Sequence, residues 1–193
     1  MRTSTYFLLT VLVMVAIPAV ALHSDEDVIG FYFDAQAESN CLETAPYVTV
    51  PLHLVLTNPA MEAICGYEFG YSVSGNYMVS GTTLMGFSPI DVGGGQGNHI
   101  VGLAAPLTPH GATVLVTLSV FVMDDKQIQF DLHGANPASI TDHPELPVLA
   151  LGNGTMQNPV LSSPEGVSSA KINGSCNPET DISSWDGVKS LYQ

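Results

Sequence analysis

The feature that most constrains the fold of this chain is a period-two alternation of large apolar residues. Between Val48 and Leu56 every even position is a valine or a leucine, and the same alternation returns between Val114 and Val122. Side chains of a β-strand point alternately to the two faces of a sheet, so each segment predicts a strand with one face in a core. Pro51 has no amide hydrogen to donate, which predicts an edge position or a bulge in the first strand.

Further strands are predicted at 29–33, 65–73 and 128–132, and turn-forming residues separate them, as in the glycine run 93–97. No convincing helical stripe precedes residue 180. Many short strands joined by such turns are typical of an all-β protein with an antiparallel two-sheet sandwich. We expect one such domain over residues 22–176, with 136–169 as irregular structure that closes it.

The strand at 65–73 also predicts which of its side chains are buried, because large and small residues alternate along it. A slip of one residue would invert every side chain, so the pattern defines two faces. The buried face is expected to hold Tyr67, Phe69 and Tyr71. The solvent-exposed face is expected to hold Gly66, Glu68 and Gly70.

The first 21 residues have the pattern of a secretory signal peptide. Arg2 supplies a positive charge, the apolar run from Phe7 to Ala16 follows, and the segment 19–21 fits a small-x-small cleavage site. No second long apolar run exists, so we expect no membrane span after signal cleavage. The predicted location is secreted, periplasmic or on the cell surface.

The charge of the chain excludes two classes of partner. Its basic residues are Arg2, Lys126, Lys171 and Lys189, against 18 acidic residues, so no arginine is left after signal cleavage. Nucleic acid and anionic lipid would be repelled by such a protein, and the bidentate guanidinium that binds phosphates is missing. We therefore expect no nucleic-acid partner and an unknown protein or carbohydrate ligand.

Three cysteines leave at least one thiol without an intramolecular partner. Cys41 and Cys65 are close in sequence and flank adjacent predicted strands, which favours a disulfide between them with Cys176 unpaired. The alternative is a bridge from either of these two to Cys176, which would tie the tail to the sandwich.

No arrangement of residues predicts catalysis, a metal site or a cofactor. Six histidines are scattered without the H-E-x-x-H spacing of a zinc site, the closest acid–histidine pairs being Asp131 with His133 and Asp142 with His143. Ser88 is followed by Pro89 and not by the turn of a nucleophile elbow. The glycine run 93–97 has no lysine and reads as a flexible loop. The sequence therefore predicts a protein that is not an enzyme.

Carbohydrate binding would need exposed aromatic rings in a row. The best exposed candidates are Tyr32, Tyr47 and Tyr77, which are single residues in different segments.

The C-terminal tail, residues 177–193, is expected to contain a short amphipathic helix. Ser183 is a candidate cap, and one apolar stripe is formed by Trp185, Val188, Leu191 and Tyr192. So short a helix needs an apolar surface to pack against. That surface is either the protein's own sandwich or that of a partner or export receptor, and we favour a detached or lightly docked tail.

The strand sequences also carry a resemblance to a known family. V-T-V-P-L at 48–52, C-G-Y-E-F at 65–69, A-T-V-L-V-T-L at 112–118 and I-Q-F at 128–130 resemble the strand order of cohesin-like modules over residues 28–135. The resemblance implies a cohesin-like or immunoglobulin-like jelly roll with a binding or scaffolding role. It transfers no functional residue, because the partner-binding face of that family is a sheet surface without a diagnostic motif.

The whole mature chain is also similar to a group of uncharacterised exported β-sandwich proteins of environmental bacteria. The matching segments are I-G-F-Y-F-D at 29–34, L-V-L-T-N-P at 54–59 and W-D-G-V-K-S-L-Y at 185–192. This similarity implies no activity. The function predicted from the sequence is a secreted, non-catalytic binding or adhesion module, with a purely structural exported protein or a component of a surface assembly as the alternative.

Overall fold

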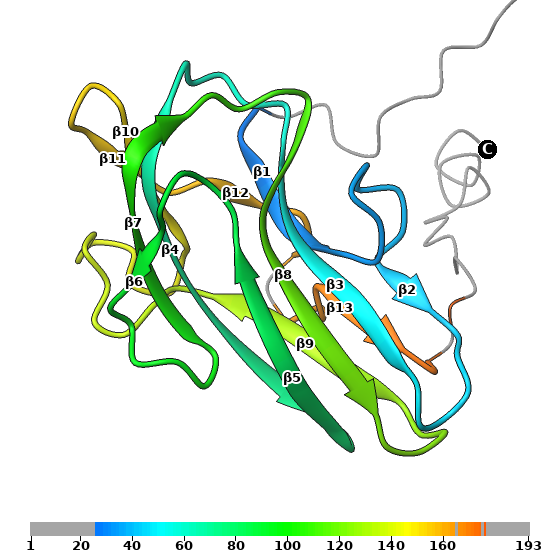
Figure 1. The fold of residues 1–193 in the computed structure, drawn as a ribbon. Coiled ribbons are helices and arrows are strands. Elements are labelled where there is room, and N and C mark those ends of the chain that lie inside the picture. The colour runs from blue at the N-terminus through cyan, green and yellow to red at the C-terminus, as the bar shows by residue number, and fades with distance from the viewer. Residues whose placement is uncertain (1–25, 165, 175, 177–193) are drawn as a thin grey trace, which may run out of the picture.

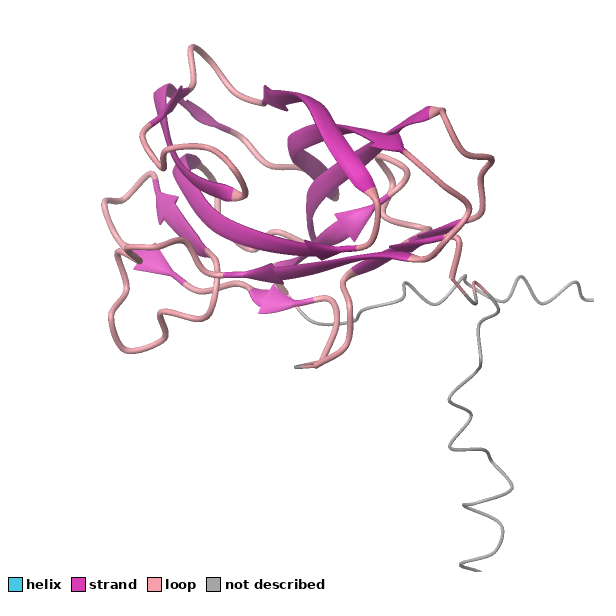
Figure 2. Cartoon of the chain, turned by 90° about the horizontal axis from the view of Figure 1, so that it is seen from below, coloured by secondary structure: helices cyan, strands magenta, loops and turns pink. Residues whose placement is uncertain are grey.

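The computed structural model describes residues 26–164, 166–174 and 176, and every regular element among them is a β-strand (Figures 1 and 2). No helix in this described part is long and apolar enough to cross a membrane. The predicted signal peptide, 1–21, and the predicted tail helix with Trp185, Val188, Leu191 and Tyr192 lie outside the described residues.

The strands follow one another along the chain without any other regular element between them. They are β1 (Val28–Tyr32), β2 (Cys41–Leu42), β3 (Thr49–Thr57), β4 (Ile64–Ser74), β5 (Tyr77–Leu84), β6 (Ile90–Asp91), β7 (Asn98–Leu107), β8 (Ala112–Val122), β9 (Ile128–His133), β10 (Val148–Leu151), β11 (Met156–Gln157), β12 (Val160–Leu161) and β13 (Ala170–Ile172).

Two sheets face one another, which confirms the predicted all-β sandwich. A five-stranded sheet has the order β12-β1-β3-β8-β5, and an eight-stranded sheet has the order β11-β10-β4-β9-β13-β2, with β7 pairing to β4 and β6 pairing to β7. Most neighbours are antiparallel, but β1 pairs with β12 and β13 pairs with β2 in parallel. Both sheets are therefore mixed at their edges.

The predicted alternation in β3 and β8 builds the centre of the five-stranded sheet. Val50, Leu52, Leu54 and Leu56 are buried, whereas Val48 is still 36% exposed at the start of the strand. In β8 the buried side chains are Leu115, Val116, Leu118, Val120 and Val122. Leu115 and Val116 are both buried because the pairing with β3 shifts by one residue at this point, as at a β-bulge.

Pro51 predicted an edge position or a bulge, and β3 has the irregularity but not the edge position. β3 lies between β1 and β8, so it is an interior strand, and its irregularity lies at Leu54 and Val55. β1, however, pairs only with residues 53–57 of β3. Pro51 thus lies where one side of the strand has no neighbour, and its missing donor costs no ladder hydrogen bond.

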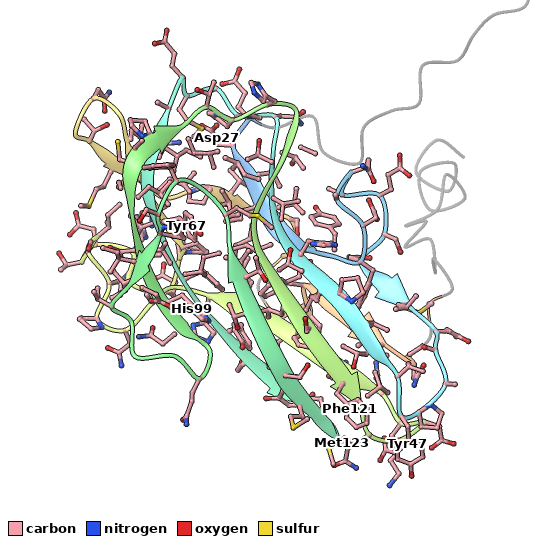
Figure 3. All side chains as sticks on the ribbon, viewed as in Figure 1. Asp27, Tyr47, Tyr67, His99, Phe121 and Met123 are labelled. Atoms are coloured by element: carbon pink, nitrogen blue, oxygen red, sulfur yellow. A yellow bond between two sulfur atoms is a disulfide. The ribbon has the colours of Figure 1, made fainter. Side chains whose placement is uncertain are left out.

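β4 supplies the aromatic face that meets the five-stranded sheet. Tyr67 and Phe69 are fully buried and Tyr71 is half-buried, as the alternation predicted. Tyr67 crosses the interior, where its hydroxyl donates to the Leu115 carbonyl at 2.9 Å and lies 3.2 Å from the Met85 carbonyl (Figure 3). Burial raises the pKa of this phenol, so it remains a donor.

The prediction that the opposite face of β4 is exposed is wrong. Glu68 is only 8% exposed, because the loop after β9 covers it and Ser139 donates both its amide and its hydroxyl to the carboxylate. A Cβ at Gly70 would lie within 2.5 Å of the Gly134 carbonyl oxygen. Alternation decides which way a side chain points, but it does not say whether a distant loop covers that face.

The predicted Cys41–Cys65 disulfide is also wrong. Cys41 is bonded to Cys176, and Cys65 is a free thiol. β13 runs parallel to β2, with Lys171 opposite Cys41, and this pairing brings the following segment to the first cysteine. Closeness in sequence therefore does not decide the pairing, and the alternative bridge to Cys176 is the one formed.

We expect that Tyr67→Phe lowers the free energy of unfolding by about 1 kcal/mol, because the buried Leu115 carbonyl loses one of its two donors and keeps only the Met85 amide. Urea unfolding of the wild type and the variant measures this loss. Tyr71→Phe is the matched control, since the Tyr71 hydroxyl makes no hydrogen bond within the described residues. Equal losses in both variants would contradict a stabilising contact between the sheets at Tyr67.

We expect that Cys41→Ser lowers the free energy of unfolding by about 4 kcal/mol, because the bridge closes a loop of 135 residues in the unfolded chain. Cys65→Ser should change it by less than about 1 kcal/mol. Peptide mapping of the non-reduced protein should find a linked peptide pair with Cys41 and Cys176. A linked Cys41–Cys65 pair would contradict the structure.

Candidate functional site

The outer face of the eight-stranded sheet has one row of residues that crosses five strands. The strand register aligns them as neighbours, and all point away from the core side on which Tyr67 lies. In order from β11 to β6 they are Met156, Ala150, Gly66, Gly102 and Ile90.

The middle of this row is free of large side chains. A Cβ at Gly66 would lie 2.6 Å from the Val101 carbonyl oxygen, so the close approach of β7 requires glycine at this position. A Cβ at Gly102 would meet no atom within 4 Å. The two glycines and Ala150 therefore form a flat floor, in which Gly66 is buried and Gly102 is exposed.

Apolar side chains border this floor. Ile90 is 65% exposed and Val92 is 72% exposed, and Ile100 lies beside them on β7. Together with the glycines they enclose a hollow of about 320 Å³. We call this hollow the outer groove. Exposed branched aliphatic side chains around a depression are typical of a surface that binds another molecule.

Cys65 also lines the outer groove, because β4 has an irregularity at this residue. The pairing of β4 with both β10 and β7 shifts between Ile64 and Gly66. Ile64 is buried in the core, whereas Cys65 and the following Gly66 both line the groove. The free thiol of Cys65 is therefore part of this surface.

Among the described residues, Glu68 is the one acidic residue that lines the outer groove, and its carboxylate is already bound by Ser139. No lysine, arginine or histidine of this described part lines the groove. The groove has the chemistry of a contact surface for apolar groups. It does not bring a nucleophile and a base together in the described residues.

The predicted aromatic candidates for carbohydrate binding are not brought together. Tyr32 is only 5% exposed, Tyr77 is half-buried against the core, and Tyr47 is 74% exposed. Tyr47 lies near Phe121 and Met123 at one end of the five-stranded sheet (Figure 3). One exposed ring is not the row of rings that stacks on a sugar chain.

The acid–histidine pairs noted in the sequence do not form clusters. His143 lies 3.3 Å from Glu145 on the surface, and the ring of His133 is bound to the Gly134 carbonyl. The described residues contain no group of three side chains that could hold a metal ion. The histidine that the fold does pair closely with an acid is His99, whose Nδ1 lies 2.6 Å from Asp91.

Sequence reasoning missed the outer groove. Ile90 and Val92 alternate with Asp91, and Ile100 and Gly102 alternate with Val101, so each segment carried a weak strand signal. β6, however, has only two residues. The pairing of Gly102 with Gly66, which makes the floor, joins segments 36 positions apart and has no local signal.

No protein-family model matches this chain, and no curated protein matches its sequence. Solved structures do. The sixth cohesin of scaffoldin B from Acetivibrio cellulolyticus, in complex with a dockerin, has a TM-score of 0.51 and 9% identity, covering 77% of this chain and 99% of that chain. The fold is cohesin-like.

Two further solved structures are similar. A cohesin module of a family 33 glycoside hydrolase from Clostridium perfringens has a TM-score of 0.49 and 11% identity, covering 76% of this chain and 98% of that chain. A non-cellulosomal cohesin from the archaeon Archaeoglobus fulgidus has a TM-score of 0.46 and 10% identity, covering 76% and 88%.

Proposed function

We propose that this protein is a non-catalytic protein-binding module whose partner docks on the outer groove. The observation that carries the proposal is the flat glycine floor between exposed aliphatic side chains. Gly102 leaves backbone accessible, and Ile90 and Val92 remain exposed at the side of the floor. A partner that places apolar side chains on this floor would remove both the aliphatic side chains and the bare backbone from water.

The similarity of folds supports a protein as the partner. The cohesin of scaffoldin B was solved with a dockerin, which is itself a protein. The aromatic residues of the present chain do not form a sugar-binding row, so a protein fits better than a carbohydrate. Because the chain carries a net charge of −14, a partner with a neutral or basic rim would approach most readily.

The disulfide supports action outside the cytoplasm, because such bonds persist in oxidising compartments. We infer a secreted or cell-surface protein whose signal peptide, 1–21, has been removed. The sandwich spans 22–176 in this proposal. The tail residues Trp185, Val188, Leu191 and Tyr192 would form a helical stripe for a second contact.

We expect that Gly102→Glu abolishes partner binding without unfolding the protein. The new side chain enters open space above the groove floor and places a charge where apolar groups dock. Gly81→Glu is the matched control, because Gly81 is an exposed β5 glycine with only the Ser119 side chain within 4 Å of its Cβ. Affinity capture from the native extracellular fraction should recover a protein with the wild type and Gly81→Glu, and not with Gly102→Glu.

Cys65 provides a second readout of the same surface. A bound partner should slow alkylation of this thiol by a maleimide at least about tenfold, because the groove is covered. Circular dichroism and the unfolding midpoint establish that both glycine variants are folded. Equal capture by Gly102→Glu and the wild type, with unchanged alkylation of Cys65, would contradict docking on the outer groove.

A further inference from the structure

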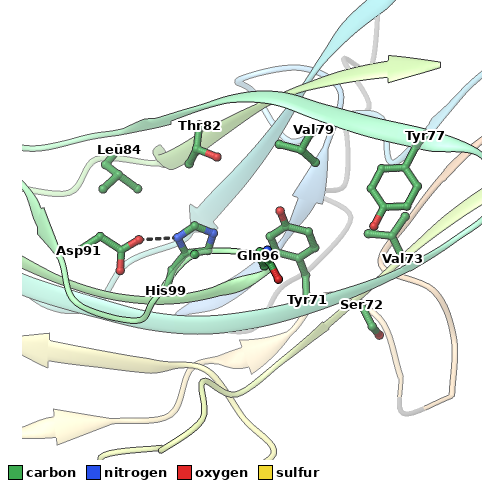
Figure 4. A pocket seen from close by; sticks show the side chains of 11 residues that line it. Tyr71, Ser72, Val73, Tyr77, Val79, Thr82, Leu84, Asp91, Gln96 and His99 are labelled. Atoms are coloured by element: carbon green, nitrogen blue, oxygen red, sulfur yellow. Dashed lines mark hydrogen bonds and ion pairs between the residues drawn. The ribbon is translucent and has the colours of Figure 1, made fainter. Parts of the chain in front are cut away.

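A second cavity, of about 810 Å³, lies inside the sandwich on the other side of β7 (Figure 4). It exists because the two sheets do not close at this place. β7 pairs with β4 only as far as Gly70, and the Tyr71 amide then bonds to the Gly97 carbonyl. The facing wall is β5, which is the edge strand of the other sheet, so the cavity opens to solvent between β4 and β5.

Asp91 and His99 form a fixed pair in the wall of this cavity. Asp91 Oδ2 lies 2.6 Å from His99 Nδ1, and Asp91 Oδ1 accepts the amides of Gly93 and Ile100 at 2.9 and 3.0 Å. Burial raises the pKa of this carboxyl, but the hydrogen bonds from His99 and the two amides outweigh burial, so its pKa lies below the usual value. Asp91 is therefore an anion that only accepts hydrogen bonds.

The position of the proton on His99 follows from this pair. An ionised carboxylate has no hydrogen to donate, so Nδ1 of His99 carries one. In the neutral imidazole Nε2 then has a lone pair. His99 is only 4% exposed, and its Nε2 is buried without a hydrogen-bond partner. A buried polar atom without a partner is unfavourable, so a ligand group that donates a hydrogen bond would stabilise it.

The ring of His99 is held in place by stacking. The centroid of its ring lies 4.7 Å from that of Phe69 and 6.0 Å from that of Tyr71, and both of these rings are nearly parallel to it. Figure 4 shows its second nitrogen turned away from Asp91, toward Tyr71 and Gln96. The unpartnered Nε2 therefore has a fixed position, buried in the wall of the cavity that His99 lines.

The charge of the cavity wall favours a cationic ligand over a neutral one. Asp91 contributes one negative charge, and no lysine or arginine in the part of the chain that the structure describes lines the cavity. A neutral hydroxyl would satisfy Nε2 but would leave this charge without a counterion. A cationic donor would both satisfy Nε2 and balance the charge of Asp91.

The rest of the wall is suited to an aliphatic stem. Val79 and Leu84 of β5 face Tyr71 and Val73 of β4 across the cavity (Figure 4). These side chains surround the path from the buried histidine to the open mouth. A ligand with a charged head and several methylenes would cover them, and the volume lies in the range of small-ligand sites.

We infer that this cavity binds a primary ammonium group on an aliphatic stem, with the ammonium donating to Nε2 of His99 and Asp91 balancing its charge. The ammonium is that of a free alkylamine or of a lysine side chain on another protein. The site is separate from the outer groove, since the two lie on opposite faces of β7.

The test is an NMR titration of the isotopically labelled protein, monitored through the amide resonances of Tyr71 and Gly97. Butylamine should give saturable shifts and bind at least about tenfold more tightly than butanol, whereas butyrate should not bind. Nα-acetyl-lysine methylamide distinguishes the source. Binding as tight as that of butylamine assigns a partner's lysine, and weaker binding assigns a free amine; both support an ammonium site.

Two pairs of variants locate the binding. Val79→Lys places an ammonium group of the protein itself in the cavity and should abolish butylamine binding. Ser80→Lys adds the same charge on the exposed side of β5 and should change the affinity for butylamine by less than about twofold. His99→Gln should weaken binding at least about tenfold. Gly102→Glu should leave it unchanged, so that failure at the outer groove is distinguished from failure here.

Butanol binding as tightly as butylamine would overturn the assignment of an ammonium. Preferred binding of butyrate, or no saturable shift with butylamine, would overturn it as well. Loss of butylamine binding in Ser80→Lys to the same extent as in Val79→Lys would mean that charge on β5, and not the cavity, is responsible.

Discussion

The contact between the aliphatic face of β3 and β8 and the aromatic face of β4 is the interaction on which the rest of the structure depends. Leu52, Leu118 and Phe69 are all fully buried there, and burial of such side chains stabilises the fold by about 1.5–3 kcal/mol each. Tyr67 adds a hydrogen bond across the same interface. Since β4 is fixed by its inward side chains, the positions of its outward residues are fixed with them.

This division of β4 and β7 into two faces creates two separate surfaces. On β7, His99 and Val101 point inward, whereas Ile100 and Gly102 belong to the outer groove. Strand geometry separates the polar dyad in the cavity from the aliphatic groove by the thickness of one sheet. One module thus carries an apolar groove and a charged, partly enclosed cavity on opposite faces of β7.

The loop 93–97 makes specific contacts that its glycine-rich composition does not predict. The glycine run 93–97 reads as a flexible loop in the sequence, yet Gly93 donates to Asp91 and a Cβ there would meet the backbone of β7 below 3 Å. Gly97 accepts the Tyr71 amide and ends the pairing of β4 with β7. These glycines position one end of the cavity, because only a residue without a side chain fits so close to the neighbouring backbone.

The sequence by itself determined the strands β1, β3, β4, β8 and β9, the sandwich, and the buried sides of β3, β4 and β8, because alternation is a local property that each of these segments carries. Only the tertiary structure decided that Cys41 pairs with Cys176, that a distant loop covers Glu68 and that Gly66 lies beside Gly102. Each of these depends on which segments, far apart along the chain, become neighbours in a sheet. Strand order is set by the combined packing of both sheets, and no single segment encodes it.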